Sequence, residues 1–519
     1  MPSMMRRGWA VLLALASALP ASGAGGGVEF RLRYVPIHGR RQDSIFYDFD
    51  GDGRPDLLNI SVDFDKSPQE RWLAIHFQQG GGFPEKPDRI WSVDDRACAL
   101  VFGDYLPGGG VEIGFVSGDG VYVYPPGERG PAEAPVKLLH ARTFFRAPSM
   151  RNLPVWWWRT DLDGDRREDL VLPLSEGYRV YLQTAPGVFG RTATLEADVV
   201  PGAPRVLASA ARAETVEVVA AQFSSVLEFP RIQPVDINGD GLQDMVTIVG
   251  DTIHYFFQKE PGVFPSQRPW RLSFSVPTLR AGAKKDTVNL ALVQFVDFDR
   301  DRLADLVVTR IEGTVGLWDS IKTSIYLHRG TGRGNFSPEK RIQIDGVSID
   351  PEFIDMDLDG KLDAVTSRLR TDLVKQAVDA YVLGDIVISY EVFQYDPKQE
   401  MFFVDPVYEK RIFVARADLE KTGAGAVPLV FIRGDLSGDG RPDMLVIDPK
   451  RNELNIHPGV LRETRHGPRI GFDGTAHWTI RLDRHPKAIA VADVNGDGVG
   501  DIILYHAGVL GLVLSNKGP

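Results

Sequence analysis

The acidic residues of this 519-residue chain recur in one nine-residue pattern, D-x-D-x-D-G-x-x-D, with oxygen-bearing side chains at positions 1, 3, 5 and 9. A chain that curls around an ion can add the main-chain carbonyl of position 7, and calcium prefers hard oxygen ligands of this kind. In the first copy, DFDGDGRPD, the candidate ligands are Asp48, Asp50, Asp52, Asp56 and the carbonyl of Arg54. The pattern therefore predicts a calcium-binding loop.

Six further copies follow along the chain, and three of them carry an amide or a hydroxyl at position 3. Their candidate ligands are Asp161, Asp163, Asp165 and Asp169; Asp236, Asn238, Asp240 and Asp244; Asp297, Asp299, Asp301 and Asp305; Asp355, Asp357, Asp359 and Asp363; Asp435, Ser437, Asp439 and Asp443; and Asp493, Asn495, Asp497 and Asp501. Two like charges about 4 Å apart repel by about 4 kcal/mol at an effective dielectric of about 20, so we expect metal-free loops to be strained. We predict up to about seven calcium ions with a structural role.

A single stretch rich in Asp and Gly is more often an ordinary hairpin turn than a metal site. Seven copies at regular spacing favour the metal. Three of the loops depart from the pattern, because Arg166 and Arg302 replace Gly at position 6, and Arg300 and Leu358 replace Gly at position 4. Where these positions require a positive φ, a residue other than Gly is disfavoured, so we expect weaker sites in these three loops.

The spacing of the loops indicates the unit that carries them. Successive copies begin 113, 75, 61, 58, 80 and 58 residues apart, and the first step is nearly twice the shortest. A degenerate copy lies within that step: residues 99–124, ALVFGDYLPGGGVEIGFVSGDGVYVY, keep the flanking apolar stretches and Asp104 but have lost nearly every oxygen ligand. We therefore count eight repeats, seven of them able to bind metal.

Each repeat has the pattern of a small antiparallel sheet. Apolar residues alternate with a period of two and end in a Gly-containing turn closed by Phe, as in WLAIHFQQGGGF and YRVYLQTAPGVF. Tandem sheets of this size bury their faces by stacking, so we predict an all-β fold, a closed β-propeller of eight four-stranded blades, with seven blades as the alternative. The last repeat lacks an outer strand, which residues 28–37 can supply, and insertions are expected near 190–231 and 366–430.

The loops and the Gly-Phe hairpins resemble FG-GAP or VCBS repeats, as in the integrin α-subunit propeller and many bacterial exported proteins. The resemblance covers nearly the whole chain after its first residues. It implies that calcium binds between the first two strands of a blade in a structural role, and that recognition takes place on other loops. Activities in this family vary too widely for the resemblance to assign one.

The N-terminus predicts export. Arg6 and Arg7 precede an apolar run at residues 9–20 and small residues up to Ala24, the pattern of a signal peptide spanning 1–24, and the run is shorter than a membrane span. We expect a periplasmic, cell-surface or secreted protein with no membrane span after cleavage. Cys98 is the only cysteine, so no intrachain disulfide can form. The formal net charge of −11 argues against nucleic-acid binding, and the acidity is explained as a supply of metal ligands.

Two classes of function remain open. The first is a binding, adhesion or assembly scaffold for a protein or glycan, because propellers gather variable loops on one face. The second is a carbohydrate-active enzyme resembling polysaccharide lyases on the same scaffold, but the sequence has no H-E-x-x-H and no G-x-S-x-G motif, so no catalytic residue is nominated. We expect Trp156, Trp157 and Trp158 to pack between blades more than to stack on sugars. Four histidines recur at one repeat position, where we expect packing or surface residues more than a site: His76, His254, His328 and His457.

Overall fold

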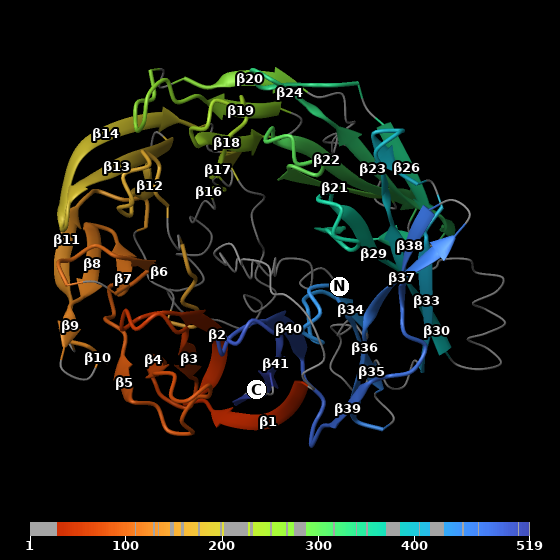
Figure 1. Cartoon of the computed structure of the whole chain (residues 1–519). Coiled ribbons are helices and arrows are strands. Elements are labelled where there is room, and N and C mark those ends of the chain that lie inside the picture. The colour runs from red at the N-terminus through yellow and green to blue at the C-terminus, as the bar shows by residue number, and fades with distance from the viewer. Residues whose placement is uncertain are drawn as a thin grey trace, which may run out of the picture.

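The chain folds into a closed ring of eight sheets (Figure 1). This computed structural model describes residues 28–517, apart from 202–226, 274–286, 370–384, 416–429 and shorter gaps of one to four residues. The described residues form strands and no helix. No helix in this part of the chain is therefore long and apolar enough to cross a membrane.

The blades follow one another in chain order, and each is an antiparallel sheet. The first four consist of β2 (Arg40–Tyr47), β3 (Asp56–Asp63), β4 (Glu70–His76) and β5 (Arg89–Ser92); β6 (Ala99–Gly103), β7 (Glu112–Ser117), β8 (Gly120–Tyr124) and β11 (Val136–His140); β12 (Leu170–Leu174), β13 (Gly177–Ala185) and β14 (Val188–Glu196); and β17 (Ile232–Val235), β18 (Asp244–Val249), β19 (Thr252–Phe256) and β20 (Trp270–Ser273). The third blade shows three strands within the described residues.

The second half of the ring repeats the arrangement. Its blades consist of β21 (Thr287–Val296), β22 (Asp305–Thr314), β23 (Leu317–His328) and β26 (Lys340–Asp345); β28 (Glu352–Ile354) with the short β27 (Val347–Ser348), β29 (Asp363–Leu369), β30 (Asp385–Phe393) and β33 (Tyr408–Ala415); β34 (Val430–Ile432), β35 (Met444–Asp448), β36 (Glu453–His457) and β39 (Trp478–Arg481); and β40 (Ala488–Ala492), β41 (Asp501–Tyr505), β42 (Val509–Lys517) and β1 (Val28–Pro36). The sequence prediction of an eight-bladed all-β propeller is confirmed.

The core lies between the blades. The second strands, such as β3, β7 and β41, are buried along nearly their whole length because a neighbouring blade covers each of their faces. At the junction of the first two blades, Leu58 and Ile60 pack in one cluster with Leu100, Phe102 and Ile113. This explains why the sequence has continuous apolar runs directly after the acidic loops.

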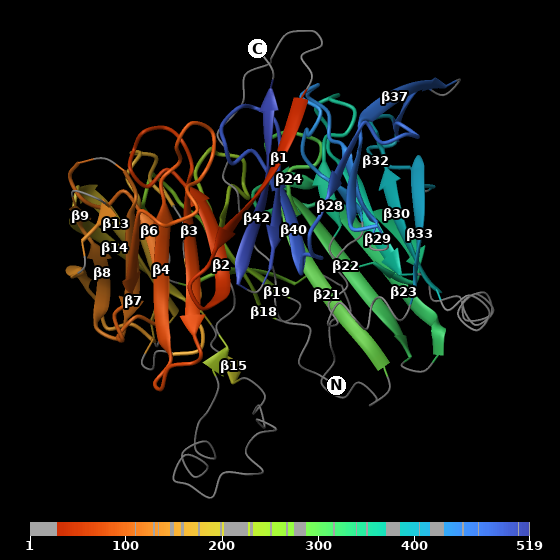
Figure 2. The same ribbon diagram turned by 90° about the horizontal axis from the view of Figure 1, so that it is seen from below.

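The first described strand closes the ring. β1 pairs antiparallel with β42 from Val28 opposite Lys517 to Pro36 opposite Val509, so the N-terminal strand is the outer strand of the last blade (Figure 2). Phe30 stacks edge-on against Trp478 at 5.8 Å between ring centroids. The indole nitrogen of Trp478 donates a hydrogen bond of 2.8 Å to the carbonyl of Val28. The ring therefore has no break between its first and last blades.

The two faces of the ring differ in the connections they carry. The acidic loops join the first strand of a blade to the second, so they all lie on one face, which we call the loop face (Figure 2). The turns between the second and third strands, and the connections from one blade to the next, lie on the opposite face, which we call the hairpin face.

The structure describes only parts of the two intervals in which insertions were expected. Within 190–231 it shows the end of β14 and a two-stranded bridge of β15 (Val200–Pro201) with β16 (Leu227–Glu228). The interval 366–430 contains β30 and β33, which are regular strands of the sixth blade, so it is not an insertion throughout. The remainder of both intervals, and the expected signal peptide 1–24, lie outside the described residues.

Candidate metal centre

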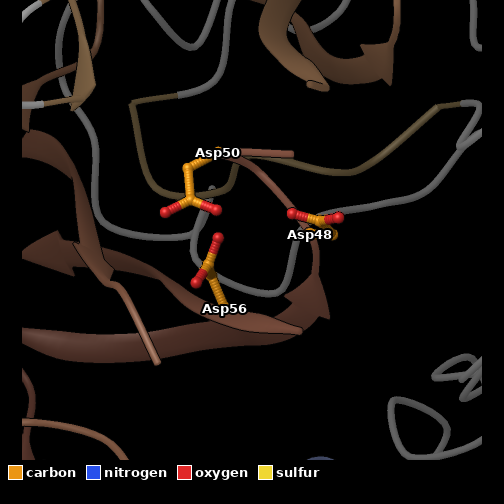
Figure 3. Close-up of side chains that lie close together, drawn as sticks. All are labelled: Asp48, Asp50 and Asp56. Atoms are coloured by element: carbon orange, nitrogen blue, oxygen red, sulfur yellow. The ribbon is translucent and has the colours of Figure 1, made fainter. Parts of the chain in front are cut away.

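The acidic loops bring carboxylates together at the loop face. In four loops, three carboxylates each have one oxygen within 4.8 Å of the others: Asp48, Asp50 and Asp56; Asp161, Asp163 and Asp169; Asp297, Asp299 and Asp305; and Asp355, Asp357 and Asp359. Figure 3 shows the first group, with the three carboxylates turned toward one another from the two ends of the loop. Within the described residues the other three loops form no such group, since Asn238, Ser437 or Asn495 stands at their position 3.

The aspartate at position 1 stabilises the conformation of each loop. Asp48 accepts hydrogen bonds from the main-chain N–H of Gly51 at 2.7 Å and from that of Gly53 at 2.8 Å. In all seven loops the N–H of position 6 donates to the position-1 carboxylate. The loop geometry thus follows from its first residue, which explains why Asp is found there in every copy.

Positions 4 and 6 adopt the left-handed backbone conformation. Gly51 has φ of 78° and Gly53 has φ of 84°, as the Gly pattern indicates. The four replacing residues also have positive φ: Arg166 at 70°, Arg300 at 55°, Arg302 at 73° and Leu358 at 61°. These side chains sit in a conformation that is unfavourable for any residue with a Cβ, so three loops carry backbone strain that the others avoid.

Position 5 does not join the carboxylate groups in the first three of the four clustered loops. In the first loop, Asp52 pairs with the guanidinium of Arg54, which lowers the pKa of Asp52 through a side-chain hydrogen bond. Asp165 also forms an ion pair with Arg167. The structure therefore separates Asp52 from the other predicted ligands of its loop, and the carbonyl of Arg54 as a ligand stays a prediction.

Position 9 has a second role that the sequence did not reveal. Asp56 is 1% exposed, and its carboxylate accepts 2.9 Å and 3.0 Å hydrogen bonds from the main-chain N–H groups of Phe49, within the loop, and Gln78, just after the third strand. The same pair of bonds occurs in the other six loops, at Asp169, Asp244, Asp305, Asp363, Asp443 and Asp501. This buried carboxylate joins its loop to the end of the third strand in the same blade.

Burial changes the acidity of these groups. Desolvation raises the pKa of Asp56 to about 6 and that of Asp363 to about 8, and the backbone N–H donors oppose it. The other five position-9 carboxyls have pKa values raised to about 6 or 7 for the same reason. At neutral pH a nearby cation would stabilise their charged form.

The degenerate second blade has a buried carboxylate at the equivalent position on a longer side chain, and this carboxylate bonds within the loop. Glu112 is the first residue of β7 and is 4% exposed, and its carboxylate accepts hydrogen bonds from the N–H groups of Tyr105 at 2.7 Å and Leu106 at 3.2 Å. Burial raises its pKa to about 7. Sequence reasoning noticed Asp104 and missed Glu112, although its place at the start of the second strand was a usable signal.

In two of the loops a side chain from outside the loop contacts the position-3 carboxylate. Arg329 contacts Asp299 at 2.5 Å through Nε and Asp301 at 3.0 Å through Nη2. In the next blade, Gln394 donates a 2.6 Å hydrogen bond to Asp357. These are the two loops in which Arg300 and Leu358 carry the positive φ at position 4, so a cation would compete there with groups of the protein itself.

The residues weighed as alternative sites lie in packed positions. Trp156 contributes to two core clusters and donates a 2.8 Å hydrogen bond from its indole nitrogen to the carbonyl of Val171, whereas Trp157 and Trp158 lie outside the described residues. The four histidines lie on third strands, and the Nδ1 atoms of three of them lie within hydrogen-bond distance of main-chain carbonyls: His76 with Pro84, His328 with Ser337 and His457 with Asp473. For Trp156 and these three histidines, the expectation of packing is confirmed.

Comparison with known proteins identifies the repeat. Residues 297–366 and 435–504 match the FG-GAP-like repeat family. Each matched segment begins at an acidic loop, contains the second to fourth strands of that blade, and continues through the first strand and acidic loop of the next blade into its second strand. The chain therefore carries FG-GAP-like repeats on an eight-bladed propeller. No curated protein matches the chain.

Several solved structures match the chain at low sequence identity and with low TM-scores. A lectin from Agrocybe aegerita, described for its recognition of non-reducing terminal N-acetylglucosamine, is 14% identical over 88% of this chain and 93% of its own, with a TM-score of 0.41. Hsv2p from Kluyveromyces lactis is 10% identical over 86% and 100%, with a TM-score of 0.32. BBS1N in complex with ARL6DN is 10% identical over 92% and 94%, also with a TM-score of 0.32. These values carry no information about ligands.

Proposed function

We propose that this chain is an exported, calcium-binding β-propeller that serves as a binding or assembly scaffold for a protein or glycan. One observation carries the proposal: the same acidic loop conformation recurs on the loop face of seven blades in a closed ring. A single loop of this kind would be explained as a turn, but seven copies indicate a common role.

The donor chemistry supports calcium as the ion. Carboxylate oxygens converge in the first loop, where burial and the charges of Asp52 and Asp48 raise the pKa of Asp50. Such crowding destabilises the charged loop unless a cation offsets it, and calcium accepts six to eight oxygen ligands in flexible geometry. The residues that would hold it are those at positions 1, 3 and 9, joined by position 5 where that side chain is not paired with arginine.

The place of the loops supports a structural role for the metal. Each loop lies between the first and second strands of a blade, and its position-9 carboxylate is already bonded to the end of the third strand. An ion that binds positions 1, 3 and 9 would therefore link all three inner strands at the loop face. Stability gained in this way replaces the disulfides that an exported chain with one cysteine lacks.

The rim of the loop face supports a scaffold function. Short hairpins that differ from blade to blade extend there, among them β37 (Gly459–Thr464) with β38 (Gly467–Phe472), visible at the upper edge of Figure 2. Variable loops on a rigid frame are the usual place for recognition. The export part of the proposal is based on the sequence pattern of residues 1–24 alone.

Thermal unfolding of the mature chain tests the metal. We expect a large fall in melting temperature when calcium is removed by excess chelator, and several calcium ions per chain by metal analysis of the purified protein. Matched measurements with magnesium and with sodium chloride of equal ionic strength separate specific binding from screening. An unchanged melting temperature together with metal-free protein would leave the loops as ordinary hairpin turns.

A further inference from the structure

The hairpin face carries a pocket of unusual charge for an acidic protein. A cavity of about 350 Å³ is lined by Arg484, His485, Lys487, His506, Gly508 and Val509. It lies where the connection from β39 to β40 meets the turn from β41 to β42. The N–H of Ile37 donates to the carbonyl of Gly508 at 3.1 Å, so the connection from β1 to β2 borders the same turn at the closure of the ring.

The cationic lining is not neutralised by neighbouring acids. Within the described residues, no ion pair is found for Arg484 or Lys487, and both side chains are exposed at the pocket. Two carboxyls in the neighbourhood, Asp43 and Asp483, interact electrostatically with Arg41 and Tyr34, and neither lines the pocket. With a net charge of −11 over the whole chain, an uncompensated group of cations calls for a partner.

The buried side of the pocket contains a polar atom that lacks a partner. His506 is 5% exposed, and among the residues that the structure describes its Nε2 atom has no hydrogen-bond partner. A buried imidazole nitrogen without a partner is costly, and a ligand that supplies one removes the cost.

Its surroundings are held in place by aromatic and cationic contacts. The Tyr34 ring lies 5.9 Å from the His506 ring, Arg484 lies over the Tyr34 ring at 5.3 Å, and the Nε of Arg41 donates to the carbonyl of His506 at 3.4 Å.

We propose that this pocket binds a small oxyanion of the phosphate or sulfate class, either as a free ion or as a group on a larger ligand. The guanidinium of Arg484 provides paired donors suited to such an oxyanion, Lys487 provides a point charge, and His506 provides the buried contact. The volume accommodates more than one bare ion. The inference does not depend on calcium, because the acidic loops lie on the opposite face.

The surroundings of His506 agree with this assignment. Burial, followed by the charges of Arg484, Arg41 and Lys487, lowers its pKa to about 4, and an interaction with the backbone of His485 opposes the shift. A bound anion offsets the repulsion from those cations, so it raises the pKa of the imidazole. This shift can be followed separately from the binding itself.

Calorimetric titration of the intact, calcium-loaded chain with inorganic phosphate and with inorganic sulfate tests the proposal, at constant ionic strength and submillimolar calcium. We expect one anion per chain. Arg484→Gln and Lys487→Gln should each weaken binding roughly tenfold, because each removes a charge-assisted contact. Arg481→Gln is the matched control: it removes one exposed charge three residues away, outside the pocket, and should leave the dissociation constant almost unchanged.

Histidine ring resonances provide the second readout, since phosphate should raise the pKa of His506 in the native chain and not in Lys487→Gln. A monosaccharide phosphate distinguishes the two sources: tighter binding than inorganic phosphate indicates a group on a larger ligand, and weaker binding indicates the free ion. Failure of every anion to bind, or equal binding by the pocket variants and the control, would overturn the proposal. Melting temperatures confirm that the exposed-residue variants are folded.

Discussion

At the scale of single residues, the repeated aspartates divide into two kinds that the sequence pattern presents as equals. Asp48 and Asp50 are exposed or half-buried and lie in the loop itself, whereas Asp56 is buried and bonded to two main-chain N–H groups. The first kind shapes the loop and, under the proposed function, would bind the cation. The second kind also maintains the blade, with or without a cation.

This division predicts different outcomes for the same substitution. Asp56→Asn replaces one acceptor oxygen by an NH2 group facing a buried N–H, so it should lower the free energy of unfolding by about 1 to 3 kcal/mol even in chelator. Asp50→Asn should change that free energy by less than about 0.5 kcal/mol in chelator and should instead reduce the gain on adding calcium. Urea unfolding with and without calcium measures both, and equal losses in chelator would contradict the division.

At the scale of elements, most features of a blade could be predicted from the sequence. The alternating third strands, the Gly-Phe turns and the step of about 60 residues predicted four-stranded sheets, and the apolar run after each loop predicted a buried second strand. The outer strand missing from the last repeat indicated its supply from the N-terminal side. What pattern reasoning could not locate is any side-chain contact between distant residues, such as that of Asp56 with Gln78, because a carboxylate in a loop looks the same whether it binds water, metal or backbone.

The same limit applies to the paired loops of the fifth and sixth blades. The positive φ of Arg300 and Leu358 followed from their place in the pattern, since Gly occupied that place elsewhere. The contact of Arg329 with Asp299 did not follow, because the two residues are 30 positions apart and only the return of the third strand brings them together. The cationic pocket could not be predicted from the sequence either, because its residues come from separate connections between strands.

The closing strand predicts a measurable contribution to stability. Phe30→Ala removes the edge-on contact with Trp478 and should lower the free energy of unfolding by about 1 to 2 kcal/mol, less than a fully buried Phe would cost because Phe30 is half-buried. Arg31→Ala is the control on the same strand, since its side chain is 64% exposed and should contribute almost nothing. Equal effects of the two substitutions in urea would show that β1 does not hold the ring through this contact.

At the scale of the whole molecule, the ring separates two kinds of charge. The loop face collects carboxylates from seven blades, and the hairpin face carries the cationic pocket at the closure. The position-9 carboxyls are distributed around the entire ring, one in each of seven blades, and the remaining blade, the second, has Glu112. Their protonation therefore affects all blades at once rather than a single site.

This distribution predicts how calcium stabilisation depends on pH. The folded pKa values of these carboxyls are about 6 to 8, above the ordinary value near 4, so the native state binds more protons than the unfolded state between those limits. In metal-depleted protein this stabilising contribution is present below about pH 4 and is lost as the pH rises through about 6 to 8, so the melting temperature should fall between pH 5 and pH 8.

Under the proposed function calcium binds the ionised loops and competes with protons, so the difference in melting temperature between calcium-loaded and metal-depleted protein should be larger at pH 8 than at pH 5. The loop of Glu112 lacks the other ligands, so the contribution of Glu112 to stability should depend on pH in the same way with and without calcium. Sodium chloride at matched ionic strength is the control for screening. A difference that is the same at both pH values would mean that calcium does not bind at the position-9 carboxylates, and the ion would then be held by positions 1 and 3 alone.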